Sequence, residues 1–194
     1  AEEQERPLNA EAAWCADAHI PHFLETLGYS LHADVAKLTD DARRDVVERT
    51  ARRRTALGGD VLKCEFPYDA GVTDRTRWAE ACAELDEASA IPWVILSAGV
   101  DDATFEAQTQ VACAAGASGV LVGRSVWKEG AHMAGAERDR WLESVGVERM
   151  RRIVDIVEAE ATPWRERSSL LDGPEPTQGW YTDYPGHQSP GLPG

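Results

Sequence analysis

The sequence predicts an α/β protein with a parallel β-sheet, and two observations support this. Four short apolar runs alternate with segments of helical periodicity along the chain. Successive runs are spaced by 38, 34 and 27 residues, measured between Glu25, Lys63, Ser97 and Arg124. Each step suits one strand–helix unit, and such alternation implies parallel strands joined by right-handed crossovers.

The apolar runs are the candidate strands. Short apolar runs between helical segments are typical of buried strands in a parallel sheet. The expected strands cover residues 22–27, 60–66, 92–97 and 119–124.

The intervening segments are the candidate helices. Thr39 and Asp40 are capping candidates for the first, which stops before Gly58 and Gly59. In the other three, apolar residues recur at helical spacing and should face the core. The expected helices cover residues 39–57, 74–89, 101–115 and 147–161. The expected core residues are Trp78, Ala81, Cys82 and Leu85, then Phe105, Thr109 and Ala112, then Met150, Ile153, Val154 and Val157.

Charge and composition exclude several classes of partner. The 194 residues carry 34 acidic and 20 basic side chains, a net charge of −14, and this argues against nucleic acid. Long uncharged apolar stretches such as residues 91–100 reach only about half of the roughly 20 residues that a membrane span needs. Residues 1–6 are acidic and lack the apolar segment of a signal peptide. We therefore expect no membrane partner.

The four cysteines predict a reduced, cytoplasmic protein. Their spacing contains no C-x₂-C pair of the kind that holds zinc, and each lies among apolar residues. We expect small buried thiols rather than metal ligands. The cysteines are Cys15, Cys64, Cys82 and Cys113.

The C-terminal segment differs from the rest of the chain. Residues 172–194 contain five prolines and five glycines with no apolar periodicity, which is typical of a disordered tail. We expect one domain over residues 1–166 and a tail over residues 167–194.

Lys63 breaks the pattern of its strand. It lies between Leu62 and Cys64 in an otherwise apolar run, and lysine is rarely buried without a partner. Side chains alternate along a strand, so Lys63 and Glu65 should point away from the covering helices. One interpretation is a structural ion pair of Lys63 with Glu65 or Glu25.

The other interpretation is chemical. A desolvated lysine amine can attack a carbonyl and form a Schiff base, a reaction that needs a nearby acid–base group. Glu25, in the middle of the preceding strand, and Glu65, on the lysine strand, are the two candidates.

The last two strands end in sequences suited to phosphate. Residues 97–100 (Ser-Ala-Gly-Val) and 123–125 (Gly-Arg-Ser) combine small residues with Arg124 before helices. Small residues let backbone N–H groups approach an anion, and a guanidinium matches phosphate. In eight-stranded barrels the last two such loops commonly hold phosphate.

These segments resemble a known family. Residues 60–67 (DVLKCEFP), 91–100 (IPWVILSAGV) and 115–127 (AGASGVLVGRSVW) are similar to class I aldolases of the tagatose 1,6-bisphosphate aldolase family, as are residues 20–29 and 161–164. The resemblance implies a (β/α)₈ TIM barrel that uses no metal or other cofactor. It implies cleavage of a ketohexose 1,6-bisphosphate to dihydroxyacetone phosphate and glyceraldehyde 3-phosphate.

The resemblance also implies roles for individual residues. Lys63 matches the Schiff-base lysine and Glu25 the glutamate that transfers protons. Glu65 is expected beside the substrate. Related barrels cleave sulfonated ketose phosphates, and this substrate class stays open. The residues that match the phosphate-holding loops are Ser97, Gly99, Gly123 and Arg124.

The resemblance covers the last four of eight strands. Without the tail, about 165 residues remain, against about 250 in a complete barrel. We expect the C-terminal half of a barrel, with unpaired strand edges that favour a homo-oligomer. A truncated half-barrel without activity, and a phosphate-binding barrel enzyme without imine chemistry, are the alternatives.

Overall fold

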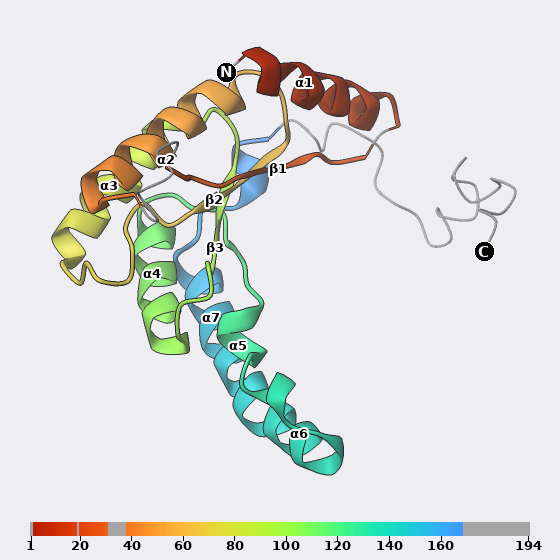
Figure 1. The fold of residues 1–194 in the computed structure, drawn as a ribbon, viewed down its shortest axis with the longest axis vertical. Helices are drawn as coiled ribbons and strands as arrows, with labels where there is room; N and C mark the ends of the chain where they lie inside the picture. The colour runs from red at the N-terminus through yellow and green to blue at the C-terminus, as the bar shows by residue number, and fades with distance from the viewer. Residues whose placement is uncertain (1, 19, 31–37, 169–194) are drawn as a thin grey trace, which may run out of the picture.

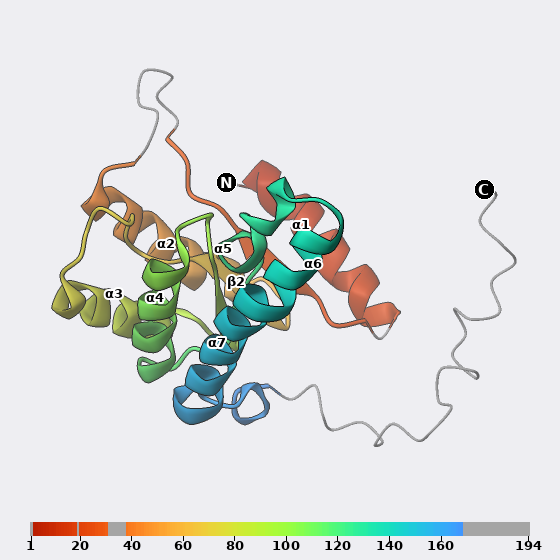
Figure 2. The ribbon, with the colours of Figure 1, turned by 90° about the horizontal axis from the view of Figure 1, so that it is seen from below.

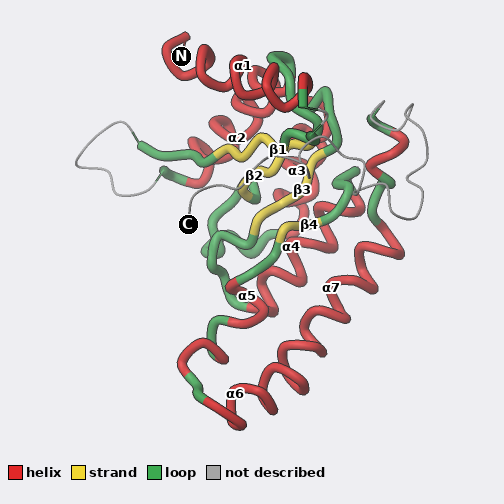
Figure 3. The backbone as a smooth tube through the Cα atoms, turned by 90° about the vertical axis from the view of Figure 1, so that its right-hand side faces the viewer, coloured by secondary structure: helices red, strands yellow, loops and turns green. Residues whose placement is uncertain are grey.

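The structure, a computed structural model, describes residues 2–18, 20–30 and 38–168. At its centre is a parallel sheet in the order β1-β2-β3-β4, so that each strand lies beside its neighbour in the chain (Figures 1 and 3). The strands are β1 (Phe23–Thr26), β2 (Val61–Glu65), β3 (Trp93–Leu96) and β4 (Val120–Leu121). The predicted α/β fold is confirmed, and consecutive parallel strands are the arrangement of a partial TIM barrel.

Each of the four predicted helices is present; three come next after their strand, and the fourth is separated from β4 by further helical segments. Figure 2 shows α2, α3, α4 and α7 following one another around the sheet. The Asp74 and Asp101 carboxylates each accept a backbone N–H from the first turn of the next helix, at 2.9 Å. Thr39 precedes α2, but its side chain makes no such bond. The helices are α2 (Asp40–Thr55), α3 (Arg75–Ala88), α4 (Asp102–Ala114) and α7 (Val147–Glu160).

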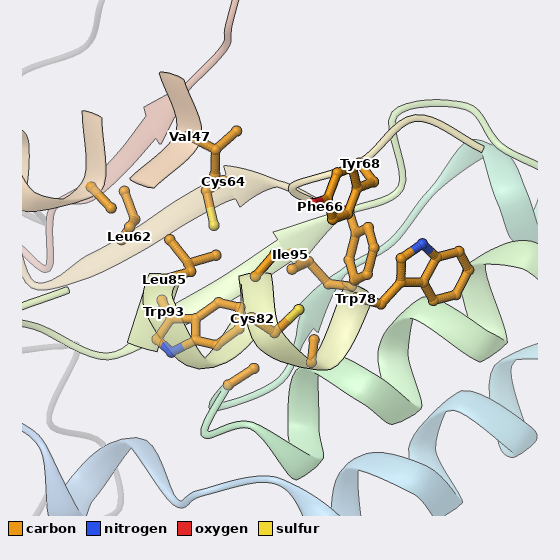
Figure 4. Packing of buried hydrophobic residues seen from close by; sticks show 14 of the residues in the cluster. Val47, Leu62, Cys64, Phe66, Tyr68, Trp78, Cys82, Leu85, Trp93 and Ile95 are labelled. Atoms are coloured by element: carbon orange, nitrogen blue, oxygen red, sulfur yellow. The ribbon is translucent and has the colours of Figure 1, made fainter. Parts of the chain in front are cut away.

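The core lies between the sheet and α2, α3 and α4 (Figure 4). Leu62, Cys64 and Phe66 are buried on the covered side of the sheet, as the alternation predicts. Trp93, paired with Leu62 in the ladder, is fully buried, and its indole N–H donates to Asp86 of α3 at 2.7 Å. This bond satisfies the one polar group that the ring brings into the core. The expected core residues of α3 and α4 are all buried.

The other face of the sheet is open. Phe23 and Glu25 of β1 share this face with Lys63, because side chains alternate along each strand. Apolar residues on the two outer strands are exposed there, Phe23 by 49% and Leu121 by 42%. Within the described ranges, the outer edges of β1 and β4 pair with no further strand.

The region around β4 and α7 departs from the sequence prediction. β4 has only two residues, and Arg124 begins a helix rather than ending a strand. On α7, Ile153 is buried but Met150 and Val154 are exposed, so the expectation that all its apolar residues point inward is wrong. Met150 and Val154 line an open apolar groove with Leu121, at the edge where the described chain places no further strand.

Other elements have no counterpart among the predicted ones. A helix precedes β1, and a helical arm joins β4 to α7, projecting away from the sheet (Figure 1). In this arm a π-helical segment connects α6 to α7 without a break. These elements are α1 (Glu2–Asp17), α5 (Arg124–Trp127), η1 (Gly130–His132), α6 (Gly135–Trp141) and η2 (Leu142–Gly146).

The described chain ends against α3. After η3 (Trp164–Glu166), the guanidinium of Arg167 bonds the carboxylate of Asp86 and donates to the carbonyl of Ser89. Arg167, predicted as the first tail residue, is thus docked on the domain, and residues 169–194 lie outside the described residues. No helix in the described ranges is both long and apolar enough to cross a membrane.

Candidate active site

Lys63 and Glu25 form an ion pair on the open face of the sheet. The two residues are paired in the β1–β2 register, and Lys63 Nζ donates to Glu25 Oε2 at 2.9 Å. Neighbouring strands lie about 4.8 Å apart, so side chains at paired positions on one face can reach each other. The structure thus brings the two predicted catalytic residues together.

The pair is accessible to a ligand. A quarter of the Lys63 side chain (25%) and about half of that of Glu25 (47%) are exposed, so Lys63 is less buried than its strand predicts. Val94, which pairs with Lys63 on β3, is buried and supplies an apolar neighbour. An amine and a carboxylate at this distance can exchange a proton, and they also form the structural ion pair of the other interpretation.

Glu65 is engaged with other partners. Its Oε1 pairs with Arg43 Nη2 at 3.0 Å, and its Oε2 accepts the N–H of Gly28 at 2.6 Å. Arg43 also donates to the carbonyl of Phe66 at 3.2 Å. Glu65 therefore fastens the start of α2 and the end of β1 to β2, and the alternative Lys63–Glu65 pair does not form.

A pocket of about 390 Å³ opens beside this contact. Glu65, Leu96 and Gly99 line it, together with the carboxamide-bearing Gln108 of α4. It lies at the carboxyl ends of β2 and β3, where ligands bind in parallel α/β folds. Glu65 thus lines this pocket, while its carboxylate is occupied by Arg43 and Gly28.

The turn after β3 is tight. The N–H of Val100 donates to the carbonyl of Ser97 at 3.0 Å, and Ala98 and Gly99 have φ angles of +48° and +82°. Glycine tolerates this left-handed region, whereas alanine is strained there, and such strain persists only where the surroundings fix the conformation. The surroundings therefore hold the turn that carries Ser97 and Gly99 in one shape.

Arg124 lies over this turn. A Cβ built on Gly99 would be 3.6 Å from Arg124 Cζ, an ordinary van der Waals distance, so the guanidinium packs directly against the turn. Arg124 is exposed, and its guanidinium has no hydrogen bond or ion pair with the part of the chain that the structure describes. An uncompensated guanidinium beside a tight turn suits a phosphate.

Lys63 and the turn after β3 lie at different levels along the strand direction. The sequence takes Lys63 and Ser97 as matching points of successive strand–helix units, but the register pairs Lys63 with Val94. Ser97 lies three residues further, about 10 Å along the strand direction. The turn that holds Ser97 therefore lies beyond the amine, toward the carboxyl ends of the strands, and Lys63 and Ser97 do not occupy matching positions in the sheet.

Comparison with known proteins places the chain in a family. The model of the DeoC/LacD family aldolases matches residues 2–129, which include the strands that carry Lys63, Glu25 and both loops. The chain belongs to the DeoC/LacD aldolase family. The resemblance seen in the sequence is confirmed.

Curated relatives of this DeoC/LacD family chain are tagatose 1,6-diphosphate aldolases. One from Streptococcus agalactiae serotype V is 29% identical, over 86% of this chain and 57% of the relative. One from Streptococcus pyogenes serotype M1 is 31% identical, over 79% and 53%, and one from Streptococcus mutans serotype c is 30% identical, over 80% and 54%. The chain thus spans somewhat more than half the length of these relatives.

Contacts in the site of this family member include residues that the sequence did not reveal. Arg43, the partner of Glu65, and Ser125, whose hydroxyl donates to the carbonyl of Val100 at 2.9 Å, are two of them. A third is Arg149 of α7, which reaches the loop after β4. Their partners are 20 or more residues away in the chain, so spacing gives no signal for them.

Three thiols of this aldolase-family chain, those of Cys64, Cys82 and Cys113, lie buried in the core as expected, whereas Cys15 of α1 is half-buried, so the expectation is wrong for Cys15. Burial raises the pKa of Cys64, that of Cys82 to about 12 and that of Cys113 to about 11. Thiolate, the form that reacts and binds metals, is therefore disfavoured at neutral pH. Among the residues that the structure describes, no three His, Cys, Asp or Glu side chains are grouped to hold a metal ion.

Proposed function

We propose that this chain carries the Schiff-base half of a class I aldolase site that cleaves a ketohexose 1,6-bisphosphate of the tagatose type. The products are dihydroxyacetone phosphate and glyceraldehyde 3-phosphate. The observation that carries the proposal is the Lys63–Glu25 contact of 2.9 Å on an accessible face, with the uncompensated Arg124 beyond it. The names of the curated relatives support the substrate.

In the proposed reaction, neutral Lys63 attacks the substrate ketone, and loss of water from the carbinolamine leaves an iminium. A base then removes the proton of the C4 hydroxyl, the C3–C4 bond breaks, and its electron pair moves into the iminium to give an enamine. Protonation at C3 and hydrolysis release dihydroxyacetone phosphate and restore the amine. Glu25, in contact with Nζ, is the proposed group that shuttles these protons.

The proposed phosphate site combines both loops. Arg124 supplies the charge, while Gly99 and Gly123 let the ligand approach the backbone closely. Ser97 supplies a hydroxyl at the foot of the turn. The net charge of −14 makes the overall electrostatic field of the chain repel an anionic substrate. Attraction of the phosphate therefore depends on the local positive charge of Arg124.

Borohydride trapping tests the imine directly. In the presence of dihydroxyacetone phosphate, borohydride should reduce the iminium and label the parent chain, while Lys63→Ala should take no label. Lys128→Ala is the matched control, since this lysine lies on the loop after α5, and it should be labelled like the parent. Equal labelling of Lys63→Ala and the parent would show that the lysine assignment is wrong.

A sulfonated ketose phosphate is the alternative substrate. It would form the same iminium at Lys63 and would differ at one anionic end of the sugar. Parallel cleavage assays with tagatose 1,6-bisphosphate and a sulfofructose phosphate should give the higher kcat/KM for the bisphosphate. A preference for the sulfonate would overturn the proposed substrate and leave the imine chemistry in place.

The open sheet supports a second candidate function, a half-barrel that is inactive until its edges are paired. Phe23 and Leu121 are exposed on the two outer strands, and unpaired edges promote association. Light scattering combined with a cleavage assay separates the cases. A dimer or larger oligomer with turnover supports a barrel completed between copies, whereas aggregation without turnover supports an incompetent half.

A further inference from the structure

The strand pairing of the sheet does little to fix the two proposed phosphate loops relative to each other. They follow β3 and β4, and only two residue pairs, Ile95–Val120 and Leu96–Leu121, join these strands. Across the loops, the hydroxyl of Ser125 donates to the carbonyl of Val100 at 2.9 Å. A guanidinium that has to meet a phosphate loses affinity when its loop shifts, because charge-assisted hydrogen bonds depend on geometry.

Arg149 of α7 reaches the loop after β4 from outside the site. Its Nη1 donates to the carbonyls of Ser125 and Val126, at 3.3 and 3.2 Å, and to Glu129 Oε2 at 2.8 Å. These carbonyls belong to α5, a helix of four residues whose terminal carbonyls have few partners within the helix. Arg149 thus closes the carbonyl end of the short helix that begins with Arg124.

The same guanidinium also contacts the element after the other loop. Arg149 Nε lies 3.4 Å from Asp102 Oδ2, in the first turn of α4, directly after the turn that holds Gly99. Arg152, one turn further along α7, pairs with Asp102 at 2.7 Å and with Glu106 at 2.7 Å. Arg149 and Arg152 of α7 therefore bind both α5 and α4, the helices that follow the two loops.

The surroundings of Arg149 identify it as a support rather than a ligand. Its side chain is 16% exposed, lies over the ring of Trp141, and is neutralised by Glu129 and Asp102. The pairing raises the pKa of Arg149 and lowers that of Glu129, so both groups are charged at neutral pH. The guanidinium of Arg124, by contrast, forms no ion pair within the described chain.

We propose that Arg149 is a positioning residue that holds Arg124 over the Gly99 turn by joining α7 to the ends of both phosphate loops. The inference rests on the proposed phosphate site. It assigns α7, which contributes no ligand, a part in phosphate affinity.

The test compares two arginines of one helix. Arg149→Met removes the contacts, whereas Arg151→Met is the matched control, because the Arg151 side chain is exposed and makes no hydrogen bond or ion pair within the described chain. Inorganic phosphate is titrated into each full-length variant and followed by backbone NMR shifts. We expect the Kd to rise at least tenfold in Arg149→Met and to stay within twofold of the parent in Arg151→Met.

Two further variants separate positioning from folding. Arg149→Lys keeps the charge without the fork of donors and should give an intermediate Kd. Glu129→Gln changes a half-exposed partner and should weaken phosphate two- to threefold while leaving the fold intact, which keeps the inference testable if Arg149→Met does not fold. A purely structural role would lower the Tm of these variants and leave the Kd of the folded protein unchanged.

The outcomes distinguish the two levels of the proposal. If the parent binds phosphate and the Arg149 and Glu129 variants bind it equally well, the positioning inference is overturned and the proposed function stands. If the parent shows no saturable shift, or if Arg124→Met binds like the parent, the proposed phosphate site itself is wrong, and the role of Arg149 falls with it.

Discussion

Leu62 and Lys63 are adjacent on β2 but point to opposite faces of the sheet. Leu62 is completely buried beneath the helices, among Trp93 and Leu85. Lys63 lies on the open face, a quarter exposed, in an ion pair with Glu25. The covered face therefore supplies the stability of the domain, and the open face holds the proposed reactive groups, whose replacement should change chemistry more than folding.

The largest expected effect is on the covered face. Trp93→Ala should lower the free energy of unfolding by about 3–5 kcal/mol, because it removes a fully buried ring and leaves a cavity. Phe23→Ala, on the half-exposed edge of the open face, should cost less than about 1 kcal/mol. Urea unfolding followed by circular dichroism gives both values. Equal losses would show that the two faces do not differ as described.

High pH should lower the stability of the domain through the thiols buried on the covered face. The buried thiols have a raised pKa, about 12 for Cys82 and about 11 for Cys113, against 9.0 for a free thiol. The unfolded chain then loses these protons first, so stability is intact below about pH 9 and falls as pH rises, by about 1.4 kcal/mol per pH unit for each thiol. Unfolding at pH 8–10.5 checks this, and Cys82→Ala should reduce the slope by one thiol.

A smaller effect on stability is expected in the loop after β3, at the start of α4. Asp101→Ala should cost about 1 kcal/mol, because the carboxylate caps α4 through the N–H of Thr104. Thr39→Ala, at the same position before α2, should cost almost nothing, since Thr39 makes no capping bond. Thermal unfolding of both variants measures the difference, and a Thr39 loss as large as that of Asp101 would contradict the observed caps.

The smallest effect on stability should accompany the largest effect on chemistry. Lys63→Met breaks a partly exposed ion pair, which is worth at most about 1 kcal/mol, and should leave the unfolding midpoint nearly unchanged. The same variant should form no reducible imine. A large loss of stability would instead favour the structural interpretation of the Lys63–Glu25 pair.

The strands and the four main helices could be predicted from local patterns. Apolar runs and helical periodicity depend on neighbouring residues, and the structure confirms them within a few positions. The alternation on β2 also predicted which side chains of Leu62, Lys63 and Cys64 face the helices. The shortness of β4 was not predictable, because its limits depend on pairing with β3 and on the helix that begins at Arg124.

The partners within the site could be predicted only in part. Glu25 and Lys63 follow from their strands, but the choice between Glu25 and Glu65 depended on Arg43, 22 residues before Glu65, which engages the second carboxylate. Met150 and Val154 have the spacing of a buried stripe. They are exposed because the described chain places no further strand beside β4 to cover them. Long-range packing, rather than local pattern, decides these cases.

The two-residue β4 has a consequence for the motions of the domain. With so few ladder bonds, its amides should exchange with solvent through small local openings, well before those of β2 and β3. A phosphate bound between the loops that follow β3 and β4 would oppose those openings. Deuterium uptake at β4 should therefore slow by a factor of about 1 + [phosphate]/Kd, or roughly elevenfold at ten times Kd, and the weakest strand would report on ligand occupancy.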